Sequence, residues 1–95
     1  MNVQIFEDLA NIIASRRATP SDESYTSSLL KAGENKLVKK LGEENAEFIR
    51  AIISGSDEEV AGEAADIIYH LMVSLEHRNV PFEMVVDTLT KRFKK

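Results

Sequence analysis

Two pairs of acidic residues have a spacing that is typical of metal ligation. Glu44 and Glu47 lie three residues apart, and Glu63 and Asp66 repeat that spacing further along the chain. Residues three apart share one face of a helix, so each pair points to one side if its segment is helical. Four converging carboxylates repel one another unless a cation lies between them, and oxygen ligands favour Mg²⁺, Mn²⁺ or Ca²⁺ over zinc. The spacing therefore indicates a hard-cation site.

The segments that carry these pairs have the pattern of two helices joined by a very short turn. Apolar residues recur at helical spacing over 34–54 and 57–78. Gly55 is predicted to take a left-handed position at the turn, and Ser56-Asp57-Glu58-Glu59 resembles a capping box. The inner member of each acidic pair lies eight residues from Gly55. An antiparallel helix pair would therefore bring the two acidic pairs to the same height.

Acidic residues on helices ordinarily belong to a solvated surface, but the composition of residues 60–75 argues against that interpretation here. Its only ionisable groups besides Tyr69 are Glu63, Asp66 and His70. The other side chains are apolar or small around most of the circumference, as in a buried helix. Charges on a buried helix are rare unless they are paired or bound to metal. This contrast favours a metal site over a solvated face.

Other residues near the acidic pairs suggest further contacts. Gly42 and Gly62 lie inside the predicted helices, where glycine costs about 1 kcal/mol relative to alanine, so a ligand or a neighbouring helix is expected to approach closely.

Lysines precede Glu44 by one to two turns and suit a phosphate-rich ligand, although Lys40 also has the spacing of an ordinary ion pair with Glu44. His70 is either a core histidine or a contact to a carboxylate or a substrate. The cations considered are Lys36, Lys39, Lys40 and, near the C-terminus, Arg92.

The remaining segments also predict helices, and none alternates as a strand does. Helical periodicity covers 2–17, and a shorter helix is expected over 27–32. Pro81 is suited to the first position of a helix that ends near Phe93. We therefore expect an all-α helical bundle, built on the antiparallel pair, in a single domain over 1–95.

Composition excludes several classes of protein. The 12 basic and 16 acidic residues give a net charge of −4, which argues against non-specific nucleic-acid binding. The absence of cysteine excludes disulfides, thiolate metal sites and a cysteine nucleophile. Glu7 and Asp8 interrupt the first apolar stretch, so no signal-peptide core is present, and no run approaches the roughly 20 residues of a membrane helix. We expect a cytoplasmic protein that does not bind membranes.

The acidic segments also resemble a known group of enzymes. Residues 40–47 (KLGEENAE) followed by 63–66 (EAAD) are similar to the EExxE…ExxD signature of the all-α, MazG-like nucleotide pyrophosphohydrolases. Residues 24–30 (SYTSSLL) and 66–73 (DIIYHLMV) narrow the resemblance to the phosphoribosyl-ATP pyrophosphohydrolase family. The resemblance covers nearly the whole chain, and Asn45 departs from it, because a small residue is commoner there.

The resemblance implies hydrolysis of phosphoribosyl-ATP to phosphoribosyl-AMP and pyrophosphate in histidine biosynthesis, with Mg²⁺, or Mn²⁺ as a substitute. Water would attack in line at phosphorus. Glu43 or one of the metal-binding carboxylates would orient or deprotonate that water, so Glu43, Glu44 and Glu47 are the catalytic candidates. The family forms homodimers or larger assemblies. The implied metal ligands are Glu44, Glu47, Glu63 and Asp66, and the expected substrate contacts are Lys39, Lys40, Tyr25, His70 and Arg92.

Two other functions stay open at this point. One is a house-cleaning nucleoside triphosphate pyrophosphatase with the same metal site and a different base pocket. The other is a non-catalytic helical dimerisation module whose acidic face is solvated. Substrate turnover separates the first from the family assignment, and metal titration separates the second.

Overall fold

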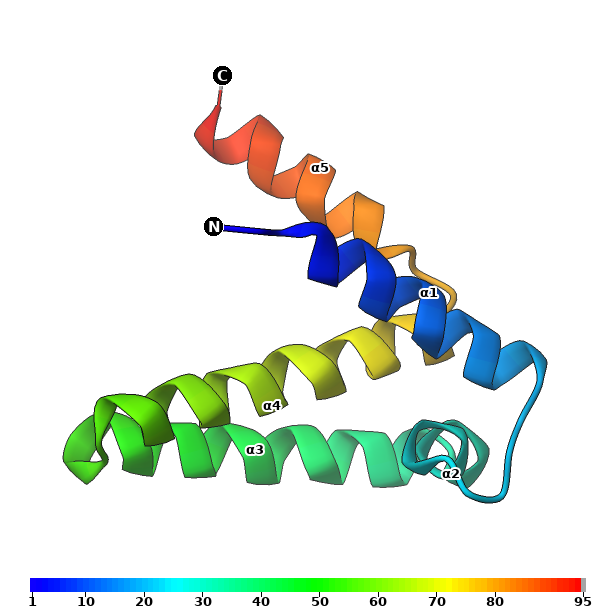
Figure 1. The fold of residues 1–95 in the computed structure, drawn as a ribbon, viewed down its shortest axis with the longest axis horizontal. Helices are drawn as coiled ribbons and strands as arrows, with labels where there is room; N and C mark the ends of the chain where they lie inside the picture. Colours follow the sequence, from blue (N-terminus) through cyan, green and yellow to red (C-terminus); the bar gives the residue numbers. More distant parts are fainter. Residues whose placement is uncertain (95) are drawn as a thin grey trace.

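Five α-helices joined by short connections make up the fold (Figure 1). The computed structural model describes residues 1–94, and within that range it contains no strand, which confirms the all-α prediction. Every predicted helix is present, and the predicted ends agree with the observed ones to within two residues. The helices in chain order are α1 (Gln4–Ala18), α2 (Tyr25–Ala32), α3 (Glu34–Ser54), α4 (Asp57–His77) and α5 (Phe82–Phe93).

The α3–α4 pair is an antiparallel hairpin with a very short turn (Figure 1). The Ser56 hydroxyl accepts a hydrogen bond from the Glu59 N–H at 3.2 Å and donates to the Glu59 carboxylate at 3.2 Å. The first bond is the predicted N-cap of α4, but the Glu59 carboxylate accepts from the Ser56 hydroxyl and not from the Ser56 N–H, so the reciprocal half of a capping box is not formed in the described chain. The left-handed prediction for Gly55 was wrong, because its φ of −89° and ψ of 166° are extended. A Cβ on Gly55 would lie 2.9 Å from the Ala51 carbonyl oxygen, so the turn needs glycine for space.

The shorter elements are fixed by local caps. The Ser24 side chain accepts a hydrogen bond from the Ser27 N–H at 3.1 Å, and α2 therefore begins two residues earlier than predicted. Gly33 has a φ of 93°, a region that favours glycine, and it connects α2 to α3. Pro81 is the N-cap of α5 instead of its first helical residue.

The hydrophobic core lies at one end of the hairpin. Fully buried Ile13, Leu29 and Val73 bring together α1, α2 and the C-terminal half of α4. The rings of Phe6 and Phe82 stack at 6.0 Å between centroids and attach α5 to α1. Leu37 and Met72 complete the buried set, and the partly buried side chains around it are Phe6, Leu9, Ala10, Leu30, Tyr69 and Phe82. This core therefore stabilises the hairpin at one end only.

The half of the hairpin near its turn is uncovered in residues 1–94, so a single chain does not provide the burial that the low polarity of 60–75 indicated. The buried residues of α4 are His70, Met72 and Val73, all in its C-terminal half. Among the described helices, α3 runs along the N-terminal half of α4, whereas α1 and α2 lie at its C-terminal half (Figure 1). A Cβ on Gly42 or Gly62 would meet no atom within 4 Å, so no neighbouring helix explains these glycines in residues 1–94. None of the described helices is long and apolar enough to cross a membrane.

Candidate functional site

Three carboxylates from the two helices of the hairpin converge on one point. Oxygen atoms of Glu44 on α3 and of Glu63 and Asp66 on α4 all lie within 4.8 Å of one another. The antiparallel pairing brings them together, because the acidic pair on α3 and the acidic pair on α4 are equally far from the turn that joins the two helices. We call these residues the carboxylate trio. Its oxygens are hard ligands of the kind that Mg²⁺ and Mn²⁺ prefer.

Glu63 has the most unfavourable environment in the trio. Its Oε2 atom is buried and has no hydrogen-bond partner. Burial raises the pKa of Glu63 above its ordinary value, and the negative charges of Glu47, Asp66 and Glu44 raise that pKa further. Buried polar atoms normally have a partner. The arrangement therefore fits a bound cation, which would satisfy this oxygen and offset the repulsion.

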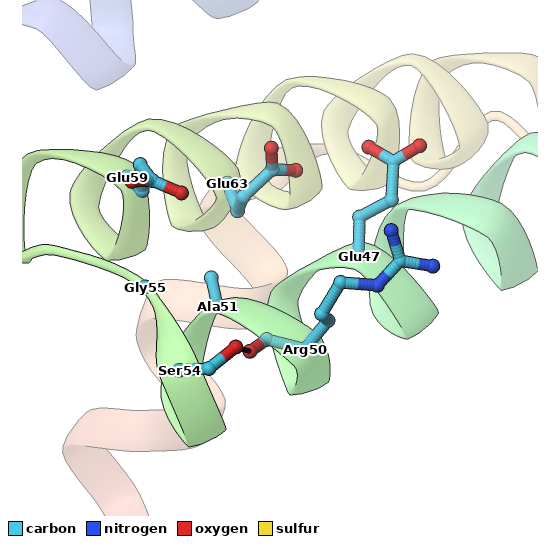
Figure 2. Close-up of a pocket in the computed structure, with 7 residues that line it drawn as sticks. All are labelled: Glu47, Arg50, Ala51, Ser54, Gly55, Glu59 and Glu63. Carbon is cyan, nitrogen blue, oxygen red and sulfur yellow. Dashed lines mark hydrogen bonds between the residues drawn. The ribbon is translucent and has the colours of Figure 1, made fainter.

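Glu47 lies outside the trio but shares a second feature with Glu63, a hollow of about 260 Å³ that we call the acidic hollow. Figure 2 shows the Glu47 side chain extending from α3 toward α4 and the Arg50 side chain running along α3, while Glu59 and Glu63 come from α4. Arg50 makes no ion pair within residues 1–94. The complete lining is Glu47, Arg50, Ala51, Ser54, Gly55, Glu59 and Glu63.

Two lining residues of the acidic hollow were missed by the sequence analysis. Arg50 follows Glu47 by three residues, and Glu59 precedes Glu63 by four. Each spacing places the missed residue on the same helix face as its acidic neighbour. Both residues therefore lie one helical turn from an acidic pair, and the i, i+3 and i, i+4 spacing is the signal that identifies them.

His70 and Tyr25 lie together beside the trio. His70 is buried, and its Nδ1 donates to the backbone carbonyl of Asp66 at 2.8 Å, so Nε2 is left as an acceptor. The Tyr25 hydroxyl lies 3.5 Å from that Nε2. The rings of Tyr25 and Tyr69 stack at 6.3 Å between centroids, and the Tyr69 hydroxyl bonds to Thr26. Half of the Tyr25 side chain stays exposed and is available to a ligand.

The predicted phosphate contacts and Glu43 form a separate group. Lys40 pairs with Glu43 at 3.6 Å, and no ion pair between Lys40 and Glu44 is present in the described chain. The pKa of Lys40 is raised, first by the Tyr25 hydroxyl and then by Glu43, so its ammonium stays charged. An open depression of about 600 Å³ is lined by Asn35, Lys36, Lys39, Lys40 and Glu43. Glu43 is therefore exposed among lysines and is not a member of the trio.

Arg92 lies apart from all of these residues. It is on α5, in a hollow with Val80, Met84 and Leu89. None of the carboxylates or lysines named above lines that hollow. Within one chain, Arg92 is therefore not part of the site around the trio.

Comparison with known proteins gives consistent matches over nearly the whole chain. A family model described as phosphoribosyl-ATP pyrophosphohydrolase matches residues 6–93. The phosphoribosyl-ATP pyrophosphatase of Trichlorobacter lovleyi is 41% identical over 92 residues, which are 97% of this chain and 85% of that protein. The histidine biosynthesis bifunctional protein HisIE of Parasynechococcus marenigrum is 47% identical over 85 residues, which are 90% of this chain. The chain spans 38% of the length of that bifunctional relative.

Proposed function

The chain belongs to the phosphoribosyl-ATP pyrophosphohydrolase family, and on that premise we propose that it hydrolyses phosphoribosyl-ATP to phosphoribosyl-AMP and pyrophosphate in histidine biosynthesis. The observation that carries this proposal is the carboxylate trio, because it lies inside the matched residues 6–93 and fits a hard cation. The related Trichlorobacter lovleyi protein, named for this activity, is similar over 85% of its own length.

We propose Mg²⁺ as the metal, with Mn²⁺ as a substitute. Glu44, Glu63 and Asp66 would hold it, and Glu47 would approach from the acidic hollow. When bound, the ion would neutralise phosphate charge and favour departure of pyrophosphate. Glu47, at the edge of the trio, and Glu43, exposed one residue before Glu44, are the carboxylates left to orient or deprotonate the attacking water.

The surrounding side chains suit a nucleotide with a charged tail. Lys39 and Lys40 present ammonium groups along the same helix as Glu44, where they would bind phosphate oxygens. Tyr25 offers an exposed aromatic ring next to the His70 Nε2 acceptor. Arg92 would join this site only if a second subunit brings it there.

The test compares phosphoribosyl-ATP with a panel of canonical and damaged nucleoside triphosphates. We expect phosphoribosyl-ATP to have the highest kcat/KM, and Glu44→Gln and Asp66→Asn each to lower it by about 100-fold or more, since each removes a charge that would hold the metal. Both variants should also lose Mn²⁺ binding in a direct titration. Glu58→Gln is the matched control, because Glu58 is exposed on α4 and lies outside the trio and the acidic hollow.

Two results would contradict the proposal. A higher kcat/KM for a nucleotide of the panel would favour the house-cleaning alternative. Unchanged Mn²⁺ binding in Glu44→Gln and Asp66→Asn would favour a dimerisation module with a solvated acidic face. Circular dichroism of each variant shows whether the helices are retained.

We further propose that the chain forms a homodimer or a larger homo-oligomer. Ile49, Ile52 and Ile53 share one face of α3 and are 59%, 59% and 78% exposed. No residue of α5 is buried, although its sequence is amphipathic. Exposed apolar surface of this kind is typical of subunit interfaces. We expect light scattering to give twice the mass of one chain or more, and Ile52→Asp to shift the protein toward monomer. A monomeric wild type at all concentrations would refute this proposal.

A further inference from the structure

A second hollow, of about 190 Å³, lies where α1, α2 and the end of α4 meet, away from the α3–α4 turn (Figure 1). We call it the basic hollow. Arg16, Arg17, Lys31 and His77 line it, and no carboxylate does. The whole chain has a net charge of −4. The basic hollow is therefore a local excess of positive charge on an acidic protein, and it favours an anionic ligand.

Hydrogen bonds join the segments around the basic hollow. Arg17 donates to the Glu76 backbone carbonyl and to Asn79 Oδ1 at 2.7 Å, and it also pairs with the Glu76 carboxylate at 3.6 Å. The buried Ser27 hydroxyl donates to the Arg16 carbonyl at 3.1 Å, which ties α2 to the end of α1. These bonds occupy Arg17 but leave the charges of Arg16 and Lys31 without an ion pair in residues 1–94. The side chains of Arg16 and Lys31 are exposed and are therefore available to an anion.

Shared and neighbouring residues link the basic hollow to the surroundings of the carboxylate trio. Arg16 also lines an adjoining hollow of about 490 Å³ that reaches Tyr25. Tyr25 in turn lies beside His70, whose Nδ1 bonds to the Asp66 carbonyl. Along α4, at 1.5 Å per residue, Asp66 and His77 are about 16 Å apart. An extended molecule with an anionic group at each end can therefore contact both regions.

We propose that the basic hollow binds a phosphate monoester, the 5′-phosphate of the substrate's phosphoribosyl group, and this assignment rests on the proposed function. Phosphoribosyl-ATP carries two separate anionic groups, a triphosphate and a sugar phosphate. The triphosphate belongs at the trio, where a metal would neutralise it. The sugar phosphate cannot share that place, because the carboxylates repel it. Arg16 and Lys31, with their charges unpaired, are the groups that bind it.

The first experiment measures binding without any turnover. Ribose 5-phosphate is titrated into the full chain, and binding is followed by NMR shifts or calorimetry. We expect saturable binding by the wild type and about tenfold weaker binding by Arg16→Gln and by Lys31→Gln. Arg78→Gln is the matched control, since it removes one positive charge beside His77 but not from the wall of the hollow. Unchanged binding in both test variants, or an equal loss in Arg78→Gln, would overturn the proposal.

The second experiment asks whether the substrate uses this hollow. Arg16→Gln and Lys31→Gln should raise the KM for phosphoribosyl-ATP about tenfold and leave kcat unchanged, because the contact is remote from the reacting phosphorus. The inhibition constant of ATP, which lacks the second sugar phosphate, should not change. An unchanged KM, with ribose 5-phosphate binding intact, would assign the hollow to a free phosphate monoester and overturn its assignment to the substrate. Absence of turnover by the wild type would refute the proposed function, while the binding titration would still decide the anion site.

Discussion

The two halves of α4 have opposite roles in the same continuous helix. Its C-terminal half buries Met72 and Val73 against α1 and α2. Its N-terminal half carries Glu63 and Asp66 and, of the described helices, has α3 beside it (Figure 1). Apolar burial stabilises the first half, whereas repulsion and desolvation disfavour the folded state in the second. Stability and the candidate chemistry are therefore placed at different ends of one element, a separation that is common where a site is strained by its function.

The buried positions of α3 show the same division. Leu37, Glu44 and Ala51 are its three buried residues, and they recur every seven positions along the face toward α4. Leu37 belongs to the core, and Ala51 leaves room for the turn at Gly55. Glu44 occupies the position between them, where a helix pair built only for stability would place an apolar side chain. A carboxylate at this position indicates selection for ligand binding.

The largest effect that separates the two halves is on stability. Leu29→Ala should lower the free energy of unfolding by about 3 kcal/mol, because Leu29 is fully buried in the core and its truncation leaves a cavity. Gly62→Ala, in the other half, should instead raise it by about 1 kcal/mol, since the added methyl group meets no atom and the helix gains propensity. Urea denaturation measures both. If Gly62→Ala destabilises the chain, another surface packs against that half.

A smaller effect is expected at the acidic hollow. Arg50→Gln should lower kcat/KM for phosphoribosyl-ATP by about tenfold, as expected for one charge-assisted hydrogen bond to a phosphate. Stability should change little, because Arg50 is exposed and has no ion pair in residues 1–94. Arg50→Lys keeps the positive charge but not the guanidinium group, and it should retain part of the activity that Arg50→Gln loses. Full activity in Arg50→Gln would show that the acidic hollow does not contact the phosphates.

Local rules predicted the hairpin well. The N-cap at Ser56 and the apolar periodicity determine where α3 and α4 begin and end. The equal distance of the two acidic pairs from Gly55 placed Glu44, Glu63 and Asp66 close together, because helix rise is constant. The positions of Glu47 at the edge and of Glu43 among the lysines depend on side-chain rotamers, which spacing does not specify.

The sequence predictions that differ from the structure concern properties that depend on more than one segment of the chain. The low polarity of 60–75 predicted a buried helix. Composition indicates that such a helix is covered, but it does not identify the surface that covers it. Gly55 was expected to relieve backbone strain, yet its role is to avoid the Ala51 carbonyl oxygen. The basic hollow joins residues from α1, α2 and α4, and no spacing along the chain brings them together. Tertiary packing determines such sites.

The smallest effect concerns Glu63, whose pKa is raised by burial and by the neighbouring carboxylates. The folded chain then binds this proton more tightly than the unfolded chain. Stability from this group is present below the ordinary glutamate pKa and is lost as the pH rises through the raised value. The metal-free protein should therefore lose stability as the pH rises through the raised pKa of Glu63, and Glu63→Gln should raise the Tm above that pH and flatten this dependence. Mg²⁺ should stabilise the wild type but not the variant. Glu58→Gln, which removes a charge outside the trio, should behave like the wild type; a Tm that falls in Glu63→Gln would mean that the charge of Glu63 stabilises the fold.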